Sequence, residues 1–256
     1  MYGIARVLGI AACALIGNSV LGQVSEEPHG YAILSLIGDE ISIVGHEKAT
    51  GSNMDRNRHG SIAVEDRALD TTAVLAAVNA IKRLDARATT IPVMSNDPAL
   101  YELQNQLFES QDRSVALLAG LKESLKGQNA THLVLITKHR GDALLRLANQ
   151  YEGSGKIEGV GLYMDASILT QRSDTHAVGH GFLAFFAYIK VTLVDVKTMT
   201  VIREKNVEES TTESTARAEG SLRPADVYTG AQKAAALQIM IRRAIARAMP
   251  DLLAAK

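Results

Sequence analysis

The sequence is poor in cysteine and in aromatic residues. Of its 256 residues, one is Cys and none is Trp, and Phe, Tyr and Trp together make up 4%. The single Cys13 excludes a disulfide framework within the chain and a zinc site built from several thiolates. Because aromatic side chains are scarce, we expect a core built mainly from Ala, Val, Leu and Ile.

The chain also lacks an excess of positive or negative charge. The chain carries 27 Lys and Arg against 28 Asp and Glu, for a formal net charge of −1. Proteins that are drawn to nucleic acid or anionic lipid by their overall field carry a clear excess of basic residues. The overall balance therefore supports neither partner. The 46% of apolar residues and 21% of charged residues are ordinary for a globular protein, so a sizeable core can form.

A long apolar run opens the chain. Arg6 precedes a largely apolar stretch over residues 7–21, and a polar segment follows Gly22. This order is typical of a cleavable secretion signal. A membrane span needs about 20 strongly apolar residues, so we expect no stable transmembrane anchor. We expect cleavage after Gly22, which makes residues 1–22 a signal peptide and places residues 23–256 in the periplasm or outside the cell.

Cys13 offers an alternative within this run. It follows Ile10-Ala11-Ala12, which are residue types found before the lipid-modified cysteine of bacterial lipoproteins. However, the apolar run before Cys13 is only about half a normal signal core, and Ala14-Leu15-Ile16 after it remain apolar. We therefore expect Cys13 to be removed with the signal, with a lipoprotein anchored at Cys13 as the alternative.

The first half of the mature chain predicts a hairpin, a loop and a helix. Two β-branched runs within Tyr31–Val44 flank the turn pair Gly38-Asp39 and predict a hairpin. Residues 45–67 are rich in Gly, Asn, Asp, Arg and His and predict a long loop or an irregular hairpin. An amphipathic helix capped by Asp70 or Thr71 is predicted next, with a buried stripe of Val74, Ala77, Val78, Ile81 and Leu84.

Four shorter elements follow. Ile91–Met94 predicts a short strand, in which Pro92 favours a position among the first residues or at a sheet edge. Asp97-Pro98 begins a second helix, with Asp97 as its N-cap. A third helix ends at Gly127 and has one apolar face, formed by Val115, Leu118, Leu121 and Leu125. The continuous apolar run within His132–Thr137 predicts a central strand buried on both faces.

The second half is dominated by strand patterns. Lys156–Met164 and Phe182–Val196 predict strands, the latter with one face that is apolar at least to Leu193. A short turn then leads into Thr200–Glu204, which predicts a second hairpin. Residues 208–229 are mostly small and polar, which favours a flexible surface segment or a helix of little core contact.

A helix from about Ala231 to Met249 closes the chain. Its expected buried stripe consists of Leu237, Ile241, Ala244, Ile245 and Ala248, and its other faces carry Lys233, Arg242, Arg243 and Arg247. A basic helix can dock on an acidic partner or a membrane, but we expect a solvated face with positive charge near the helix's negative end. The predicted fold class is α/β (α+β), with one mixed sheet, helices packed on it and a C-terminal helix, in a single domain over residues 23–256.

The order of elements resembles two families of bacterial envelope domains. The run from Tyr188 ends in Leu193-Val194-Asp195-Val196-Lys197-Thr198, before the return strand and the terminal helix. Curli-secretion (CsgG-like) and penicillin-binding-protein-activator (LpoB-like) domains have a string ending Leu-Val-Asp-Val-x-Thr-Gly at a hairpin, and Met199 replaces this glycine. The resemblance spans most of the mature chain and implies a periplasmic, non-enzymatic assembly or regulatory role. The lipid anchor of these families and the membrane-spanning hairpins of the curli channel are not carried over.

Common catalytic motifs are incomplete or missing. Gly153-Ser154-Gly155-Lys156 lacks the glycine spacing of a phosphate loop, and Ile157 stands where Ser or Thr would bind magnesium. Gly159-Val160-Gly161 lacks the third glycine of a dinucleotide fingerprint. Neither a Gly-x-Ser-x-Gly elbow nor a His-Glu-x-x-His helix occurs. We expect no catalytic residue and no cofactor.

The strongest remaining candidate for chemistry is Asp174 with His176 and His180. Two imidazoles four residues apart and a carboxylate are ligand types that zinc or copper accepts. Gly179 and Gly181 loosen this segment, so the convergence that a helix would give cannot be assumed. We expect two surface histidines and no bound metal.

Two functions from different classes follow. The first is a non-enzymatic binding, assembly or regulatory module for a periplasmic or outer-membrane protein, with a sheet edge or an apolar helix face as its contact surface. The alternative is a metal-dependent hydrolase or metal-binding protein that uses the His176/His180 region. The sequence provides no nucleophile, acid and base around these histidines, which favours the first function. Self-association remains open.

Overall fold

The computed structural model describes residues 29–47, 57–64, 66–108, 113–125, 127–147, 150–217 and 220–254. The predicted signal peptide at residues 1–22, with Cys13, lies outside the described residues. In chain order the elements are β1 (Gly30–Ser35), β2 (Glu40–Gly45), β3 (Arg58–Ala63), α1 (Ala68–Leu84), β4 (Thr89–Val93), α2 (Pro98–Asn105), η1 (Gln106–Phe108), α3 (Arg113–Ser124), β5 (His132–Lys138), β6 (Arg140–Asp142), β7 (Leu145–Leu147), β8 (Gln150–Glu152), β9 (Lys156–Gln171), β10 (Val178–Asp195), β11 (Thr200–Ser214), β12 (Ala216–Arg217), β13 (Gly220–Ser221), η2 (Pro224–Asp226) and α4 (Gly230–Leu253).

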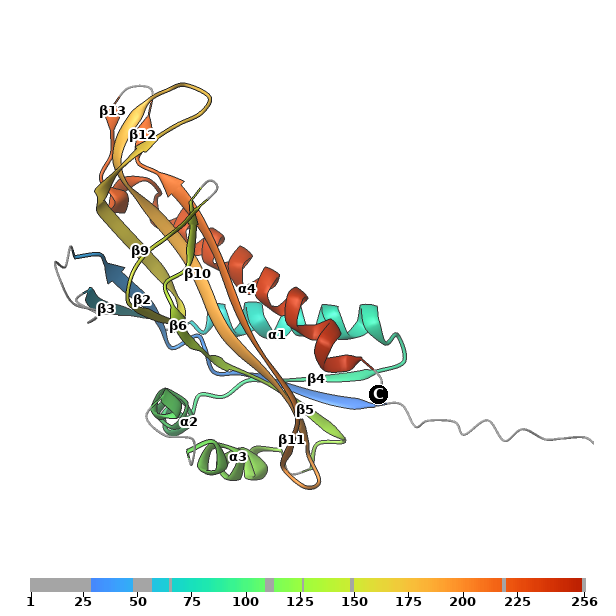
Figure 1. Ribbon diagram of the computed structural model, residues 1–256. Coiled ribbons are helices and arrows are strands. Elements are labelled where there is room, and N and C mark those ends of the chain that lie inside the picture. The colour runs from blue at the N-terminus through green and yellow to red at the C-terminus, as the bar shows by residue number, and fades with distance from the viewer. Residues whose placement is uncertain are drawn as a thin grey trace, which may run out of the picture.

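The sheet is arranged around β10, its longest strand (Figure 1). The main path runs β3-β2-β9-β10-β5-β1-β4, and β11 pairs antiparallel with β10 along most of its length. On the opposite edge of β10, β9 pairs with the first half and β5 with the second half. Because β1 runs parallel to both β4 and β5, the sheet is mixed. The predicted fold class is therefore confirmed.

Alternating side chains of β10 build two different faces. Phe185, Ile189 and Val191 lie in one apolar cluster with residues of α1 and α4. Phe182, Phe186 and Tyr188 point to the other face, into a cluster with Leu145 of β7 and with Ala143, which directly follows β6. This alternation is the period of two expected of a strand that separates two packed layers.

Helices α2 and α3 cover the remaining part of that second face (Figure 1). Their apolar residues pack against Leu34 of β1 and against Leu133 and Leu135 of β5. Val134 and Ile136 point to the opposite face, into the cluster with α1 and α4. Strand β5 is thus buried on both faces, as its continuous apolar run predicts.

The predicted hairpin over residues 31–44 is wrong. Both strands exist, but β1 pairs with β4 and β5, whereas β2 pairs with β3 and β9. The segment between them crosses from one part of the sheet to another. The Asp70 carboxylate holds this crossing, since its Oδ1 accepts hydrogen bonds from the Ile37 and Gly38 amides at 2.9 and 3.1 Å. Gly38 is required there, because a Cβ would lie 2.6 Å from Asp70 Oδ2.

The predicted capping role of Asp70 or Thr71 is also wrong. Helix α1 begins at Ala68, and the Asp66 carboxylate accepts a hydrogen bond from the Ala68 amide at 3.1 Å. Asp70 is buried in the first turn and accepts further hydrogen bonds from the Ser35 hydroxyl at 2.7 Å and the Tyr101 hydroxyl at 2.8 Å. It therefore joins the crossing segment to α1 and α2. The predicted buried stripe of α1 is confirmed at every position but Leu84, which is exposed.

Several local predictions are confirmed. Strand β4 is an edge strand that contains Pro92. Asp97 caps α2 by accepting a hydrogen bond from the Ala99 amide at 2.9 Å, and Gly127 has the left-handed backbone expected after α3, with φ of 78°. Residues 45–67, predicted as a long loop or an irregular hairpin, contain β3, which pairs with β2, but β2 ends at Gly45, so only one strand of this hairpin lies within the predicted range.

The turn between β10 and β11 contains the string on which the family resemblance rests. The Asp195 carboxylate accepts hydrogen bonds from the Thr198 amide and hydroxyl at 2.8 and 2.9 Å. The Thr198 amide is the main reason that the pKa of Asp195 lies below its ordinary value. Met199 follows with φ of 55°, the left-handed conformation that glycine adopts most easily.

The return strand is much longer than predicted. The pattern predicts a strand over Thr200–Glu204, whereas β11 continues to Ser214. Residues 208–214, predicted as a surface segment or a helix, therefore pair with β10. The C-terminal helix α4 is confirmed and extends beyond Met249 to Leu253, with its predicted stripe buried. No helix in the described part of the chain is long and apolar enough to cross a membrane.

Candidate functional site

The outer edge of β11 is an open edge of the main sheet. Among the described residues, β11 pairs with β10 and with no other strand. Half of the backbone N–H and C=O groups of such an edge strand point away from its neighbour, where they can form hydrogen bonds to another chain. With 15 residues, this edge is longer than an ordinary strand.

A groove of about 710 Å³ runs along this edge. Its floor consists of six consecutive residues of β11, from Lys205 to Ser210. Residues on both faces of the strand line the same hollow, so the groove follows the outer edge of the backbone. One wall is formed by Arg247 and Asp251 of α4, and the other by Leu144, Arg146 and Tyr151 around the β7–β8 hairpin.

Two ion pairs hold the α4 wall against the strand. Lys205 Nζ lies 2.8 Å from Asp251 Oδ2, and Arg247 Nη1 donates to Glu209 Oε1 at 2.7 Å. The hydrogen bond from Lys205 keeps the pKa of Asp251 below its ordinary value, and the bond to Glu209 raises the pKa of Arg247. Arg203 also donates to the carbonyl of Leu252 near the end of α4. These contacts are made by side chains on the face of β11 that points toward α4, and they fix the distance between α4 and the strand.

The opposite wall presents apolar surface to solvent. Leu144 is 53% exposed and Tyr151 is 69% exposed. The wall is joined to β11 by a hydrogen bond at 2.6 Å from the Thr212 hydroxyl to the Arg146 carbonyl. An extended chain in the groove could therefore bond to the backbone of β11 and cover both exposed side chains.

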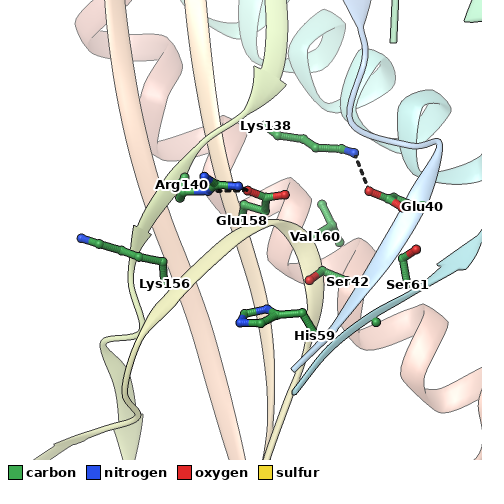
Figure 2. A pocket seen from close by; sticks show the side chains of 10 residues that line it. Glu40, Ser42, His59, Ser61, Lys138, Arg140, Lys156, Glu158 and Val160 are labelled. Carbon is green, nitrogen blue, oxygen red and sulfur yellow. Dashed lines mark hydrogen bonds and ion pairs between the residues drawn. The ribbon is translucent and has the colours of Figure 1, made fainter. Parts of the chain in front are cut away.

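A second hollow, of about 520 Å³, lies toward the β3 end of the sheet, between β2, β3, β5 and β9 (Figure 2). Lys138 enters it with a side chain that is 3% exposed. Its ammonium group lies 2.8 Å from the Asp39 carboxylate and 3.2 Å from that of Glu40, and donates to Asn105 Oδ1 at 3.0 Å. This network ties β5 to the start of β2 and to α2.

The other cations of this hollow are also opposed by carboxylates. Arg140 lies 2.6 Å from Glu158, and Lys156 lies 2.6 Å from Asp142. Because charges of both signs alternate around the hollow, they largely cancel for an incoming ion. A buried charge that already has its partners contributes mainly to the geometry of the fold. The arrangement is better explained as a structural network than as a binding site.

The structure places the three candidate metal ligands around the β9–β10 turn. Asp174 is engaged by Arg172, whose guanidinium donates to both carboxylate oxygens at 2.9 and 2.6 Å and lowers the pKa of Asp174. His176 lies in the turn with φ of 55°, and His180 lies in β10. In the described ranges, no group of three or more His, Cys, Asp and Glu side chains is placed to hold a metal ion. That these residues bind no metal stays a prediction.

The groove was not predictable as a site. The sequence analysis anticipates a sheet edge as a contact surface, but it ends the return strand at Glu204, before the groove begins. The signal for a longer strand is weak, since Val207 is the one large apolar residue between Lys205 and Ser210. Val207 is buried against the α1/α4 side, and its neighbours along the strand are polar because they face the groove or solvent.

Comparison with known proteins gives weak likenesses. No protein family and no curated protein sequence matches the chain. Among solved structures, the PelC dodecamer from Paraburkholderia phytofirmans is 11% identical with a TM-score of 0.32, covering 90% of both chains. A protein described as a neuraminyllactose-binding hemagglutinin homolog from Helicobacter pylori is 10% identical with a TM-score of 0.37, covering 86% of this chain and 83% of that one. The lipoprotein GNA1162 from Neisseria meningitidis is 6% identical with a TM-score of 0.28, covering 75% and 89%. Likenesses at these values do not identify a function.

Proposed function

We propose that the mature chain is a non-enzymatic, exported binding module that captures an extended segment of an envelope protein along the outer edge of β11. The observation that carries this proposal is the groove whose floor is the open strand edge from Lys205 to Ser210. Strand addition to such an edge takes its affinity from main-chain hydrogen bonds and its specificity from the side chains beside the groove.

The dimensions of the groove suit a short peptide segment. Six residues of an extended strand span about 20 Å at about 3.4 Å per residue. Alternate side chains of the bound segment would face α4 and the β7–β8 hairpin. On the β7–β8 side, Leu144 and Tyr151 favour apolar or aromatic residues, since each Å² of apolar surface removed from water contributes about 25 cal/mol. On the α4 side, Arg247 and Asp251 favour polar residues.

The exported location rests on the predicted signal peptide. If residues 1–22 are removed, mass spectrometry of the protein from its native envelope should show a chain that begins near Gln23. An intact Met1 would contradict export by this route. A lipid-modified terminus at Cys13 would support the lipoprotein alternative and leave the groove unaffected.

Site-specific cross-linking tests the groove directly. Because the predicted mature chain contains no cysteine, a single introduced thiol can carry a short photo-activated cross-linker. We would label Ser210→Cys in the groove and Asn96→Cys, an exposed control before α2, in the protein expressed in its native envelope. Ser61→Cys would probe β3, the edge strand at the far end of the sheet.

The proposal predicts that Ser210→Cys cross-links to one contiguous segment of a second polypeptide and that Asn96→Cys does not. A product joining the groove of one copy to the β3 edge of another would make the occupant a second copy of this chain. Equal products from Ser210→Cys and Asn96→Cys, or none from Ser210→Cys while Ser61→Cys captures a partner, would refute the groove as the binding site.

A further inference from the structure

The outward surface of the α1/α4 helix pair gathers positive charge that the composition of the chain does not reveal. Lys82 and Arg83 on α1 and Arg242 and Arg243 on α4 line a groove of about 700 Å³ between the two helices. All four side chains belong to exposed residues. We name this surface, formed by these four cations, the basic face. It lies apart from the β11 groove, which α4 borders through Arg247 and Asp251.

The cations of the basic face are not neutralised by neighbouring acids. Within the described part of the chain, none of the four forms an ion pair, although most other basic side chains near the sheet do. The acidic residues of the two helices are engaged elsewhere, since Asp70 is buried below α1 and Asp251 pairs with Lys205. Four like charges gathered around one groove create a local positive potential even in a chain of net charge −1.

Apolar side chains lie among these charges. Ile239, in the groove, is 43% exposed, and Leu75 of α1, one turn before Asn79 of the groove, is 53% exposed. The groove also contains Ala76 and Ala246. Exposed aliphatic residues between Lys and Arg are the combination found on helices that lie in a membrane interface, where apolar groups enter the acyl region and cations meet phosphate. An acidic protein segment would use the cations but has no need of the exposed aliphatic residues.

The geometry of the helix pair suits a flat surface. Helices α1 and α4 pack against each other on the same face of the sheet, through the cluster that also contains the odd-numbered residues of β10 (Figure 1). Their outward sides therefore lie next to each other, and both apolar and basic residues can reach one plane. We infer that the basic face docks the protein on the surface of a membrane rich in anionic phospholipid.

Vesicle binding by the purified mature protein tests this inference. The probes are vesicles of phosphatidylcholine alone and vesicles in which about a third of the lipid is phosphatidylglycerol. The inference predicts that the protein binds to the anionic vesicles. This binding should weaken as salt is added, because salt screens the attraction between surface charges. Arg242→Gln with Arg243→Gln should reduce the affinity roughly 30-fold, as each basic residue near an anionic surface contributes about fivefold.

Matched variants separate this surface from general charge effects. Lys122→Gln with Lys197→Gln removes the same charge from α3 and from the β10–β11 turn, and should change the affinity less than about twofold. Ile239→Ser with Leu75→Ser should also weaken binding while keeping its salt dependence. Both double variants on the basic face should retain the parent's melting temperature, because the substituted side chains are exposed.

Equal binding by the parent and the Arg242→Gln/Arg243→Gln variant would overturn the inference, as would equal binding to vesicles with and without anionic lipid. A third result would also overturn it. If a polyglutamate peptide binds the parent through the same arginines while anionic vesicles do not bind, the basic face recognises an acidic protein segment. None of these results depends on whether β11 captures a peptide, so the two proposals can fail separately.

Discussion

The carboxylate of Asp70 illustrates how one residue can determine a chain crossing. It accepts four hydrogen bonds, from the amides of Ile37 and Gly38 and from the hydroxyls of Ser35 and Tyr101. The sequence predicts Asp70 only as a helix cap, because the spacing of a cap is local. Its true partners lie more than 30 positions away along the chain, and no local pattern indicates them.

The first prediction concerns the stability of Asp70 variants. Asp70→Ala leaves buried donors without an acceptor, at about 1–3 kcal/mol for each, so we expect a loss of at least about 3 kcal/mol in the free energy of unfolding. Asp70→Asn keeps an acceptor oxygen and should lose less. Urea unfolding measures both values. Equal losses for the two variants would show that the hydrogen bonds to Asp70 do not hold the crossing.

The burial of Asp70 also predicts that the stability of the protein depends on pH. Burial raises the pKa of Asp70, and this effect exceeds the lowering by its hydrogen bonds. In the folded protein the protonated form is therefore favoured relative to the unfolded chain. Stability due to this group is present at low pH and declines as the pH rises from about 4 through the raised pKa. The stability of the parent relative to Asp70→Asn should fall over this interval, and an increase would contradict the raised pKa.

The second prediction concerns Met199, which stands where the resembling families have glycine. Its φ of 55° is unfavourable for a residue with a Cβ, by about 1–2 kcal/mol, but its side chain packs against the cluster of α2 and α3. Met199→Gly removes both contributions, and Met199→Ala removes only the packing. We expect the Gly variant to be more stable than the Ala variant by about 1 kcal/mol in urea unfolding. Equal stability would mean that the turn carries no strain at Met199.

The third prediction is that the histidine pair has no metal role. The carboxylate of Asp174 is held by Arg172, the two histidines lie in a turn and in a strand, and among the described residues no three potential ligands are placed around one ion. Replacing both His176 and His180 by Ala should leave the melting temperature unchanged, with or without added zinc. Zinc stabilisation of the parent alone, lost in the double variant, would favour the metalloprotein alternative.

At the scale of elements, the sequence predicts regular structure well where the pattern is strong. The helix stripes of α1 and α4, the Asp97 cap and the continuous apolar run of β5 are all recovered, because each arises from local burial or local hydrogen bonding. Strand pairing is not recovered for β1 and β2, since their register depends on partners distant in sequence. The second half of β11 is missed because polar residues line its open edge, which weakens the alternation that marks a strand.

The fourth prediction tests β5 as the central element. Val134 is fully buried and Leu135 is 4% exposed, on opposite faces of the strand. Val134→Asp or Leu135→Asp places an unpaired carboxylate in the core, which costs several kcal/mol against a typical stability of about 5–15 kcal/mol. Both variants should therefore be unfolded by circular dichroism. Leu169→Asp, at a position of β9 that is 70% exposed, is the control and should fold normally.

At the scale of the whole molecule, the sheet presents one long open edge and the helix layer presents one basic face. In our two proposals, the edge of β11 supplies backbone hydrogen bonds to an extended partner, and the basic face supplies charge to a lipid surface. The sequence indicates a sheet edge and a basic C-terminal helix, but it cannot locate either surface, because the first depends on which strand lies at the edge and the second on which two helices lie side by side. Net charge and composition average over both surfaces.

Residue-resolved hydrogen exchange of the amides of β11 tests the proposed function most directly. The measurement compares the mature protein alone with its complex with a short extended peptide selected for binding from a display library. In the free protein, amides from Lys205 to Ser210 that point outward should exchange quickly, whereas those bonded to β10 should be protected. Peptide binding should slow the outward amides at least about tenfold and leave β3 unchanged. Outward amides already protected in the free protein, or protection confined to another surface, would contradict strand addition at β11.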